Sequence, residues 1–186
     1  MRLATKLIIG ITISIILICA GYCVILFHIP SSDSKYSSQV GKIEYKGQFL
    51  MPVENFNVVT SKYGARIDPI SKEESFHTGI DLVGDTGSNI LNIKKGEVTW
   101  AGWSDTGYGN CVEIKHIDET GKVFYSFYAH MRNNSICVET GQLVVEGQVL
   151  GIQGSTGWST GEHLHFEIRL EDKIKIDPTP YLFTEM

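Results

Sequence analysis

From residue 52 onward, the sequence is a succession of short runs rich in β-branched and aromatic residues, separated by glycines. Such runs are typical of β-strands, and the glycines between them are typical of turns. We find no window with a convincing hydrophobic period of 3.6 residues, which would indicate helices. The runs lie at residues 97–103, 111–117, 122–131, 135–140, 142–152 and 163–170. The sequence therefore predicts an all-β, mainly antiparallel domain over residues 52–186.

The run with the clearest pattern is "GEHLHFEIRL", residues 161–170. Polar and apolar side chains alternate along it, as in a strand with one buried face. One face would carry His163, His165, Glu167 and Arg169, and the other Leu164, Phe166, Ile168 and Leu170. A polar strand face can be functional or can simply contact water, and this stretch alone does not choose between the two.

The amino-terminal part has a different character. Residues 7–29 form an apolar run without Asp, Glu, Lys or Arg. At about 1.5 Å per residue, a helix of this length crosses a hydrocarbon core of about 30 Å. A cleaved signal peptide would have a shorter apolar region followed by small residues, whereas here "AGY" ends in Tyr22, and neither Cys19 nor Cys23 follows a small residue. We therefore predict one uncleaved transmembrane helix at residues 7–29.

Charge sets the expected orientation of this helix. Arg2 and Lys6 precede the apolar run, so the positive-inside rule keeps residues 1–6 in the cytoplasm and exports the rest. Residues 30–51 are rich in Ser, Lys and Gly and read as a linker. The part after the span contains 14 of the 16 Lys and Arg residues and all 21 Asp and Glu residues. An exported acidic domain of this kind is not expected to bind nucleic acid.

The chain has four cysteines. Cys19 and Cys23 lie in the predicted span, which leaves Cys111 and Cys137 in the exported part. Export permits a Cys111–Cys137 disulfide, and two buried free thiols are an equally acceptable alternative. The cysteines are too scattered for a zinc ribbon.

The histidines indicate a candidate metal site, because five of the six lie in the predicted domain. A zinc site built on strands needs imidazoles and a carboxylate that converge from different strands. In "FHTGIDLV", residues 76–83, His77 and Asp81 share one parity, but a flat strand would separate their Cα atoms by about 13 Å. Gly79 lies between them and allows a bend or bulge. A helical arrangement of this pair is not expected around a glycine.

Two further runs carry the other histidines of interest. "FYSFYAHM", residues 124–131, would place Tyr128 and His130 on one strand face. At the start of the predicted strand at residues 163–170, the Cα atoms of His163 and His165 would be about 6.6 Å apart. They can bind one ion together or divide the roles of ligand and base, and spacing does not distinguish these possibilities.

Six segments of the domain form one ordered series: "SKYGARIDP" (61–69), "FHTGIDL" (76–82), "GNCVEIKH" (109–116), "FYAHM" (127–131), "VETGQLVVEGQVLG" (138–151) and "STGEHLHFEIR" (159–169). In order and in spacing, they resemble the M23 or LytM-type zinc endopeptidases of the lysostaphin kind. The resemblance covers roughly residues 54–183 and implies a LytM-type β-sheet domain of barrel-sandwich-hybrid-like architecture.

The resemblance also implies a role for individual residues. The family's zinc ligands fall on His77, Asp81 and His165, which would hold one Zn²⁺, and its two other active-site histidines fall on His130 and His163. The remaining histidine of the domain, His116, belongs to the family's strand pattern but not to its metal set, so we expect a structural role. Two positions depart from the usual motifs, with Glu162 in place of proline and Met131 in place of leucine.

These observations predict a membrane-anchored zinc metalloendopeptidase that hydrolyses peptide bonds in bacterial peptidoglycan, in a cross-bridge or a stem peptide, for local remodelling of the cell wall. Its partners would be peptidoglycan peptides, the membrane through residues 7–29, and other envelope proteins. The alternative is a LytM-fold scaffold or activator that binds an envelope protein and cleaves nothing. "VETGQLVVEGQVLG" also resembles half of a biotinyl or lipoyl carrier domain, but no lysine stands at its turn.

Overall fold

The computed structural model describes residues 49–183, so the predicted span at residues 7–29 lies outside the described residues. Within this part of the chain, no helix is long and apolar enough to cross a membrane. The elements are β1 (Val58–Ser61), β2 (Gly64–Ile67), β3 (Glu74–His77), β4 (Ile80–Val83), β5 (Asn89–Leu91), β6 (Gly96–Ser104), β7 (Gly109–Ile117), β8 (Val123–Met131), β9 (Leu143–Val144), β10 (Val149–Ile152), β11 (Leu164–Leu170), β12 (Lys175–Ile176) and the short helix α1 (Thr179–Leu182).

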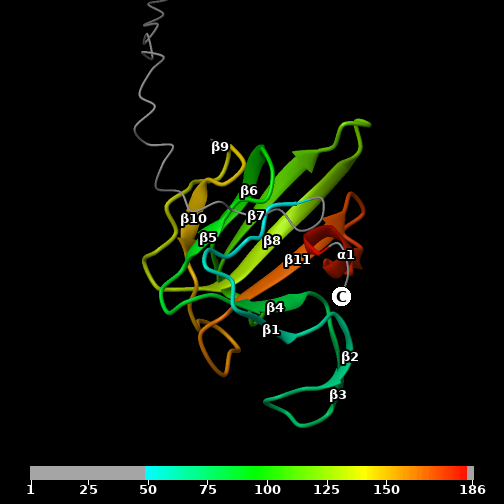
Figure 1. Cartoon of the computed structure of the whole chain (residues 1–186), viewed down its shortest axis with the longest axis vertical. Helices are drawn as coiled ribbons and strands as arrows, with labels where there is room; N and C mark the ends of the chain where they lie inside the picture. Colours follow the sequence, from blue (N-terminus) through cyan, green and yellow to red (C-terminus); the bar gives the residue numbers. More distant parts are fainter. Residues whose placement is uncertain (1–48, 184–186) are drawn as a thin grey trace, which may run out of the picture. The chain divides into compact units, whose positions relative to one another are not determined.

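One eight-stranded sheet organises these elements. Its strand order is β1-β4-β11-β8-β7-β6-β9, and β12 pairs with β11 outside this path. Two small sheets, β10-β5 and β2-β3, complete the domain, and the β2-β3 hairpin extends beyond the β1 and β4 side of the main sheet (Figure 1). Every named strand pair is antiparallel. The predicted all-β, antiparallel class is confirmed for the described residues.

The core lies against one face of the main sheet. On β11, Leu164, Phe166 and Ile168 are at most 1% exposed and belong to the main hydrophobic cluster. The intervening residues of β11 point to the opposite face, where the candidate site lies. The alternation predicted for this strand is therefore confirmed, although Leu170 at its end is 39% exposed.

The folded domain includes residues that the sequence analysis placed in the linker. Phe49 and Leu50 are buried. The Phe49 N–H donates a 3.0 Å hydrogen bond to the carbonyl of Tyr181, and the Phe49 ring stacks on Phe124 and Tyr181. The domain therefore begins no later than Phe49, because these apolar contacts close the core around α1.

Two of the predicted strands differ from the structure. Residues 135–140 are not a strand, and the apolar pattern there reflects the burial of Val138 rather than a hydrogen-bonded ladder. The run at residues 142–152 is divided by a turn at Gly147, so β9 pairs with β6 and β10 pairs with β5. Spacing along the chain does not show that one apolar run serves two sheets.

Both cysteines of the described domain are free thiols, so the disulfide that export permits is absent from this structure. Cys111 is buried, as the free-thiol alternative predicted, but that prediction is wrong for Cys137, which is exposed. Burial raises the pKa of the Cys111 thiol to about 11, which keeps it protonated and unreactive at neutral pH.

Candidate metal centre

The interruption between strands β3 and β4, at Thr78 and Gly79, brings His77 and Asp81 together. His77 ends β3, which pairs with β2, and Asp81 lies in β4, which pairs with β1 and β11. The His77 Nε2 atom is 3.1 Å from Asp81 Oδ1. A Cβ atom at Gly79 would lie 2.4 Å from the carbonyl oxygen of Phe166 and 2.9 Å from the His165 ring. The sequence predicted a bend or bulge at Gly79, and the structure shows in addition that the glycine is required for the close approach to β11.

The third member of the cluster comes from the neighbouring strand. His165 lies directly opposite Asp81 in the antiparallel β4-β11 pair. Its Nδ1 atom is 2.9 Å from Asp81 Oδ1 and 3.0 Å from His77 Nε2. The three side chains are buried, and each offers one ligand atom within 4.8 Å of the others. Four-coordinate zinc with bonds of about 2.0–2.1 Å places its ligand atoms about 3.3 Å apart, so the donor set matches this ion.

Acceptors behind each ring orient the two imidazoles. The His77 Nδ1–H donates to the carbonyl of Lys62 at 2.9 Å, and the His165 Nε2–H donates to Glu167 Oε1 at 3.1 Å. These bonds leave a lone pair on His77 Nε2 and on His165 Nδ1. Both lone pairs face Asp81, which is the arrangement that metal-binding histidines adopt.

Glu167 is the centre of a buried network beside the cluster. It is 0% exposed, and its carboxylate accepts hydrogen bonds from Thr78 Oγ1 at 2.7 Å and from the Tyr108 hydroxyl at 2.8 Å. Arg169 and Lys175 form ion pairs with it at 2.6 and 3.1 Å. Two cations and two hydroxyl groups therefore hold this carboxylate behind His165.

The two carboxylates and the His165 ring between them shift one another's pKa. Burial alone would raise the pKa of Asp81, but its close contacts with the His165 and His77 rings hold that pKa well below its usual range. Burial also disfavours a charged His165, yet the bonds to Asp81 and Glu167 raise its pKa. A proton on His165 Nδ1 and a divalent cation therefore compete for the same position, as expected for a metal ligand.

His130 reaches the same cleft because of a β-bulge. The sequence predicted that Tyr128 and His130 share a strand face, and this prediction is wrong. The register between β7 and β8 shifts between Asn110 and Val112, and His130 has a left-handed φ of 60°. Tyr128 and Met131 consequently belong to the core, whereas the His130 ring turns to the site face. A non-glycine residue in this conformation often marks a functional site.

The rings of His130 and His163 lie together on one wall of the cleft, with centroids 4.8 Å apart. The Nδ1–H groups donate to the carbonyls of Thr156 and Gly161, respectively, each at 2.8 Å. These bonds leave the Nε2 atoms available to other partners, and His163 Nε2 is 3.7 Å from Asp81 Oδ1. Burial and the nearby His163 lower the pKa of His130 to about 4.

All five predicted site residues line one cleft of about 530 Å³. Phe76 and Trp158 contribute exposed aromatic surface to it, with 58% and 76% of each residue accessible. Trp158 packs over Gly107, where an added Cβ would lie 2.9 Å from the indole. An extended peptide can thus contact aromatic walls while its backbone passes the His and Asp side chains.

His116 lies away from this cleft. It is completely buried, its Nδ1–H donates to the carbonyl of Lys95 at 3.0 Å, and its Nε2 accepts a 2.7 Å hydrogen bond from the Ser126 hydroxyl. Its ring stacks on Phe124. These contacts give His116 a packing role.

Two residues that contact the cluster, Glu167 and Arg66, were not predicted as site residues. Glu167 has a detectable signal, since it follows His165 by two positions on the same strand face. Arg66 lies in the segment "SKYGARIDP", which resembles the family, but its contact is not readable from the sequence, because the β2-β3 hairpin meets Asp81 only in the folded chain. Its Nη1 atom donates to Ser61 Oγ at 2.5 Å and to Asp81 Oδ2 at 3.3 Å.

The sheet and the His-Asp-His cluster thus define a β-domain with a candidate metal centre at the end of its central strands. Residues 75–178, more than half of the chain, match the profile of Peptidase family M23. The protein belongs to this family, as the sequence motifs indicated.

Similar proteins include both enzymes and an activator. The chain is 39% identical over 119 residues to the murein hydrolase activator NlpD of Escherichia coli (strain K12), covering 64% of this chain and 29% of NlpD. It is 34% identical over 128 residues to the DD-carboxypeptidase/endopeptidase Mpg of Neisseria meningitidis serogroup B (strain ATCC 13091 / M2091), covering 69% of this chain and 28% of Mpg. The chain therefore spans less than a third of either relative.

Among solved structures, the catalytic domain of the antimicrobial peptidase lysostaphin from Staphylococcus simulans has a similar fold. The TM-score is 0.58 at 31% sequence identity, and the match covers 69% of this chain and 92% of that domain.

Proposed function

We propose that this protein is a zinc-dependent endopeptidase that hydrolyses peptide bonds in bacterial peptidoglycan. The observation that carries the proposal is the convergence of His77, Asp81 and His165 in one buried cluster, with His130 and His163 beside it. The names of Mpg and lysostaphin, both similar to this chain, describe peptidases.

The chain's own residues suit amide hydrolysis. His77, Asp81 and His165 would hold Zn²⁺, which, when bound, lowers the pKa of a coordinated water and polarises a carbonyl. Hydrolysis forms a C–O bond from water, breaks the C–N bond and transfers one proton from water to the leaving amine. The Nε2 atoms of His130 and His163 supply the proton acceptor and the donor that this transfer requires.

Localisation is part of the proposal. Residues 7–29 would anchor the protein in the bacterial cell membrane with residues 1–6 in the cytoplasm and the catalytic domain outside. A linker of about twenty residues has a root-mean-square reach of about 25 Å. The enzyme would then act on cell wall close to the membrane, as local remodelling requires.

The direct test incubates the purified, zinc-loaded protein with peptidoglycans of different cross-link chemistry. Mass spectrometry of the released fragments identifies new amino termini and names the bond. We expect new termini that disappear with a zinc chelator and with His165→Ala, checked for native circular dichroism. Absence of new termini on every wall type would contradict the proposal.

The similarity to NlpD favours a second candidate function, activation of another murein hydrolase without cleavage by this chain. The complete set of ligand and histidine positions favours the enzyme. The two functions are separated by adding a murein hydrolase to the same assay. An activator would increase the fragments released by the added hydrolase, would release none alone, and would keep this effect after His165→Ala.

A further inference from the structure

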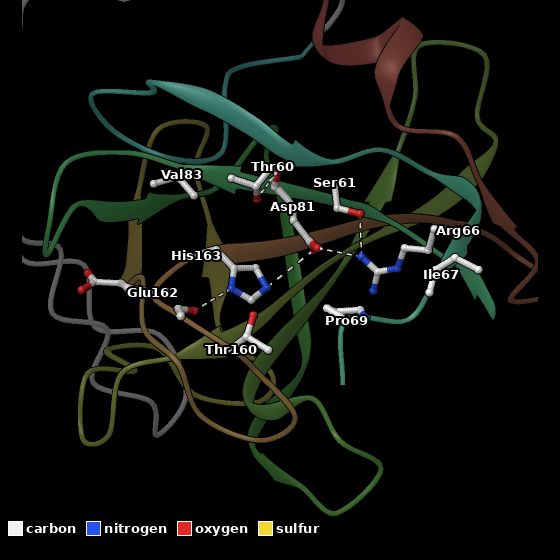
Figure 2. Close-up of a pocket in the computed structure, with 11 residues that line it drawn as sticks. Thr60, Ser61, Arg66, Ile67, Pro69, Asp81, Val83, Thr160, Glu162 and His163 are labelled. Carbon is white, nitrogen blue, oxygen red and sulfur yellow. Dashed lines mark hydrogen bonds and ion pairs between the residues drawn. The ribbon is translucent and has the colours of Figure 1, made fainter. Parts of the chain in front are cut away.

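Glu162 stands directly before His163, in the loop that leads into β11. The two side chains point in opposite directions, with the His163 ring facing Asp81 and the Glu162 carboxylate turned away from it (Figure 2). Both residues line a pocket of about 430 Å³ beside the cleft described above. Residue 162 precedes the strand ladder, because β11 begins at Leu164. The position of the His163 ring therefore depends on what fixes this loop.

One restraint on the loop comes from the backbone. The His163 N–H donates a 2.9 Å hydrogen bond to the carbonyl of Gly154, and the two residues form an isolated antiparallel bridge. Gly154 packs against the segment that carries His130, since an added Cβ would lie 2.5 Å from the Arg132 nitrogen and 2.9 Å from the His130 carbonyl oxygen. This bridge links the backbones behind the two histidine rings.

The Glu162 carboxylate supplies a second restraint. Its Oε1 atom accepts a 2.7 Å hydrogen bond from the Gly87 N–H and a 3.3 Å hydrogen bond from Arg132 Nη2. Arg132 follows His130 by two residues, and Glu162 precedes His163 by one. The ion pair therefore connects the segments that carry the two rings, on the side of the loop that the backbone bridge does not reach.

The turn that supplies the Gly87 N–H is itself anchored. Gln153, which is 1% exposed, holds this turn at residues 84–88 with its side chain. Its amide nitrogen donates to the carbonyl of Asp85 at 2.7 Å, and its amide oxygen accepts from the Gly84 N–H at 3.1 Å. Gly87 thus offers a fixed donor, so a carboxylate bound to it is held in place relative to the framework of the domain.

This arrangement bears on geometry more than on stability. Side chains of Glu162 and Arg132 are 30% and 46% accessible, and an exposed ion pair contributes little to the free energy of unfolding. However, a displacement of about 1 Å at a reacting group can lower a rate about 100-fold. His163 Nε2 lies 3.7 Å from Asp81 Oδ1, and its ring centroid lies 4.8 Å from that of His130. A shift of the loop would change both distances.

We propose that Glu162 is a positioning residue, whose carboxylate, bound to Gly87 and Arg132, fixes the loop that presents the His163 ring to Asp81 and His130. This inference rests on the proposed function. Because the carboxylate points away from Asp81, its loss should slow proton transfer at His163 without removing a contact to the peptide.

The kinetic test uses the full-length, zinc-loaded protein and the peptidoglycan fragment that it hydrolyses. We expect Glu162→Ala to lower kcat about 10-fold and to leave KM within about twofold of the wild-type value. Glu162→Gln keeps an oxygen for the Gly87 N–H and loses the charge, so its kcat should fall less. Zinc content and circular dichroism should match the wild type. Unchanged kcat in Glu162→Ala, or an increase in KM alone, would overturn the proposal.

Arg132 provides a second arm of the test. Arg132→Gln should lower kcat as much as Glu162→Gln does, and the double variant should fall no further, because each change removes the same contact. Losses that multiply in the double variant would contradict the assignment. The matched control is Glu119→Gln, which breaks an exposed ion pair with Lys94 on the turn between β7 and β8, at the opposite end of β8 from His130. This variant should keep the wild-type kcat.

Failure of the proposed function gives a different result. If the wild-type protein hydrolyses no peptide, the endopeptidase proposal fails, and the ring positions are compared directly by nuclear Overhauser effects in histidine-labelled, full-length protein. An effect between the His130 and His163 rings that is present in wild type and Glu119→Gln, and weaker in Glu162→Ala and Arg132→Gln, would support the positioning role. Equal effects in all four proteins would overturn it.

Discussion

Glu167 is completely buried, yet a hydroxyl from Thr78 and another from Tyr108 contact its carboxylate together with two cations. Burial alone would raise its pKa, but the hydrogen bond from His165 and the charges of His165 and Arg169 hold it well below the usual range. A permanently ionised carboxylate behind His165 fixes the ring tautomer that presents Nδ1 to the cluster.

Replacement of this carboxylate tests its role. We expect Glu167→Gln to weaken zinc binding about 10- to 100-fold, because the His165 Nε2–H loses an anionic acceptor. Competition with a chromophoric chelator measures the affinity. The control is Glu113→Gln, which breaks ion pairs to Arg169 and Lys173 without a contact to His165. Equal zinc affinity in the two variants would contradict this role for Glu167.

His116 makes stability depend on pH. Burial lowers its pKa to about 4, whereas the unfolded chain has a pKa of about 6.5. Between these values, the unfolded state binds a proton that the folded state rejects, so His116 stabilises the fold fully above pH 6.5 and loses this contribution as the pH falls towards 4. The expected loss is on the order of 3 kcal/mol.

Two measurements check this expectation. The ring-proton resonance that disappears in His116→Gln should titrate near pH 4 in the folded, zinc-loaded protein. Urea unfolding should show a declining free energy from pH 6.5 downward. A resonance that titrates near pH 6.5 would show that the ring is accessible to protons in the folded state.

At the level of secondary structure, the break between β3 and β4 and the bulge in β8 place the site. The first lets two short strands enter different sheets, so that residues four positions apart meet at one point. The second reverses the face of β8 after Ala129 and brings His130 beside His163. Both features interrupt a regular ladder, and bulges are known to re-aim side chains near active sites.

Gly79→Ala tests the close approach of these strands. The added methyl group would lie 2.4 Å from the Phe166 carbonyl oxygen, a contact that requires backbone movement. We expect a loss of about 1–3 kcal/mol in the free energy of unfolding, measured in urea. Gly161→Ala is the matched control, because its methyl group would meet nothing within 4 Å. Equal stability of the two variants would contradict the packing at Gly79.

For the whole domain, the cluster joins the β2-β3 hairpin to the main sheet, since its ligands come from β3, β4 and β11. Zn²⁺ at a thousand times its dissociation constant should raise the free energy of unfolding by about 4 kcal/mol. Urea denaturation with and without Zn²⁺ measures this difference. His165→Ala should lose the response, and His163→Ala should keep it while losing hydrolysis. Loss of the response in both variants would show that His163 is also required for zinc binding.

Local patterns in the sequence predicted much of this molecule. Alternation along residues 164–168 identifies the buried face of β11, because successive side chains of a strand point to opposite sides. β-branched and aromatic runs identify β6, β7 and β8 within one or two residues. The motifs that resemble M23 peptidases pointed to the five residues that the fold brings into one cleft, and the predicted span at residues 7–29 stays a prediction.

Other features depend on contacts between distant segments. The division of residues 142–152 between two sheets, the burial of Phe49 and the reversed face of His130 follow from strand pairing. Arg66 meets Asp81 only because the β2-β3 hairpin folds against β4. Hydrophobic periodicity indicates which side chains of one segment share a face with their neighbours in sequence. Which strand lies beside it is set by the packing of the whole domain.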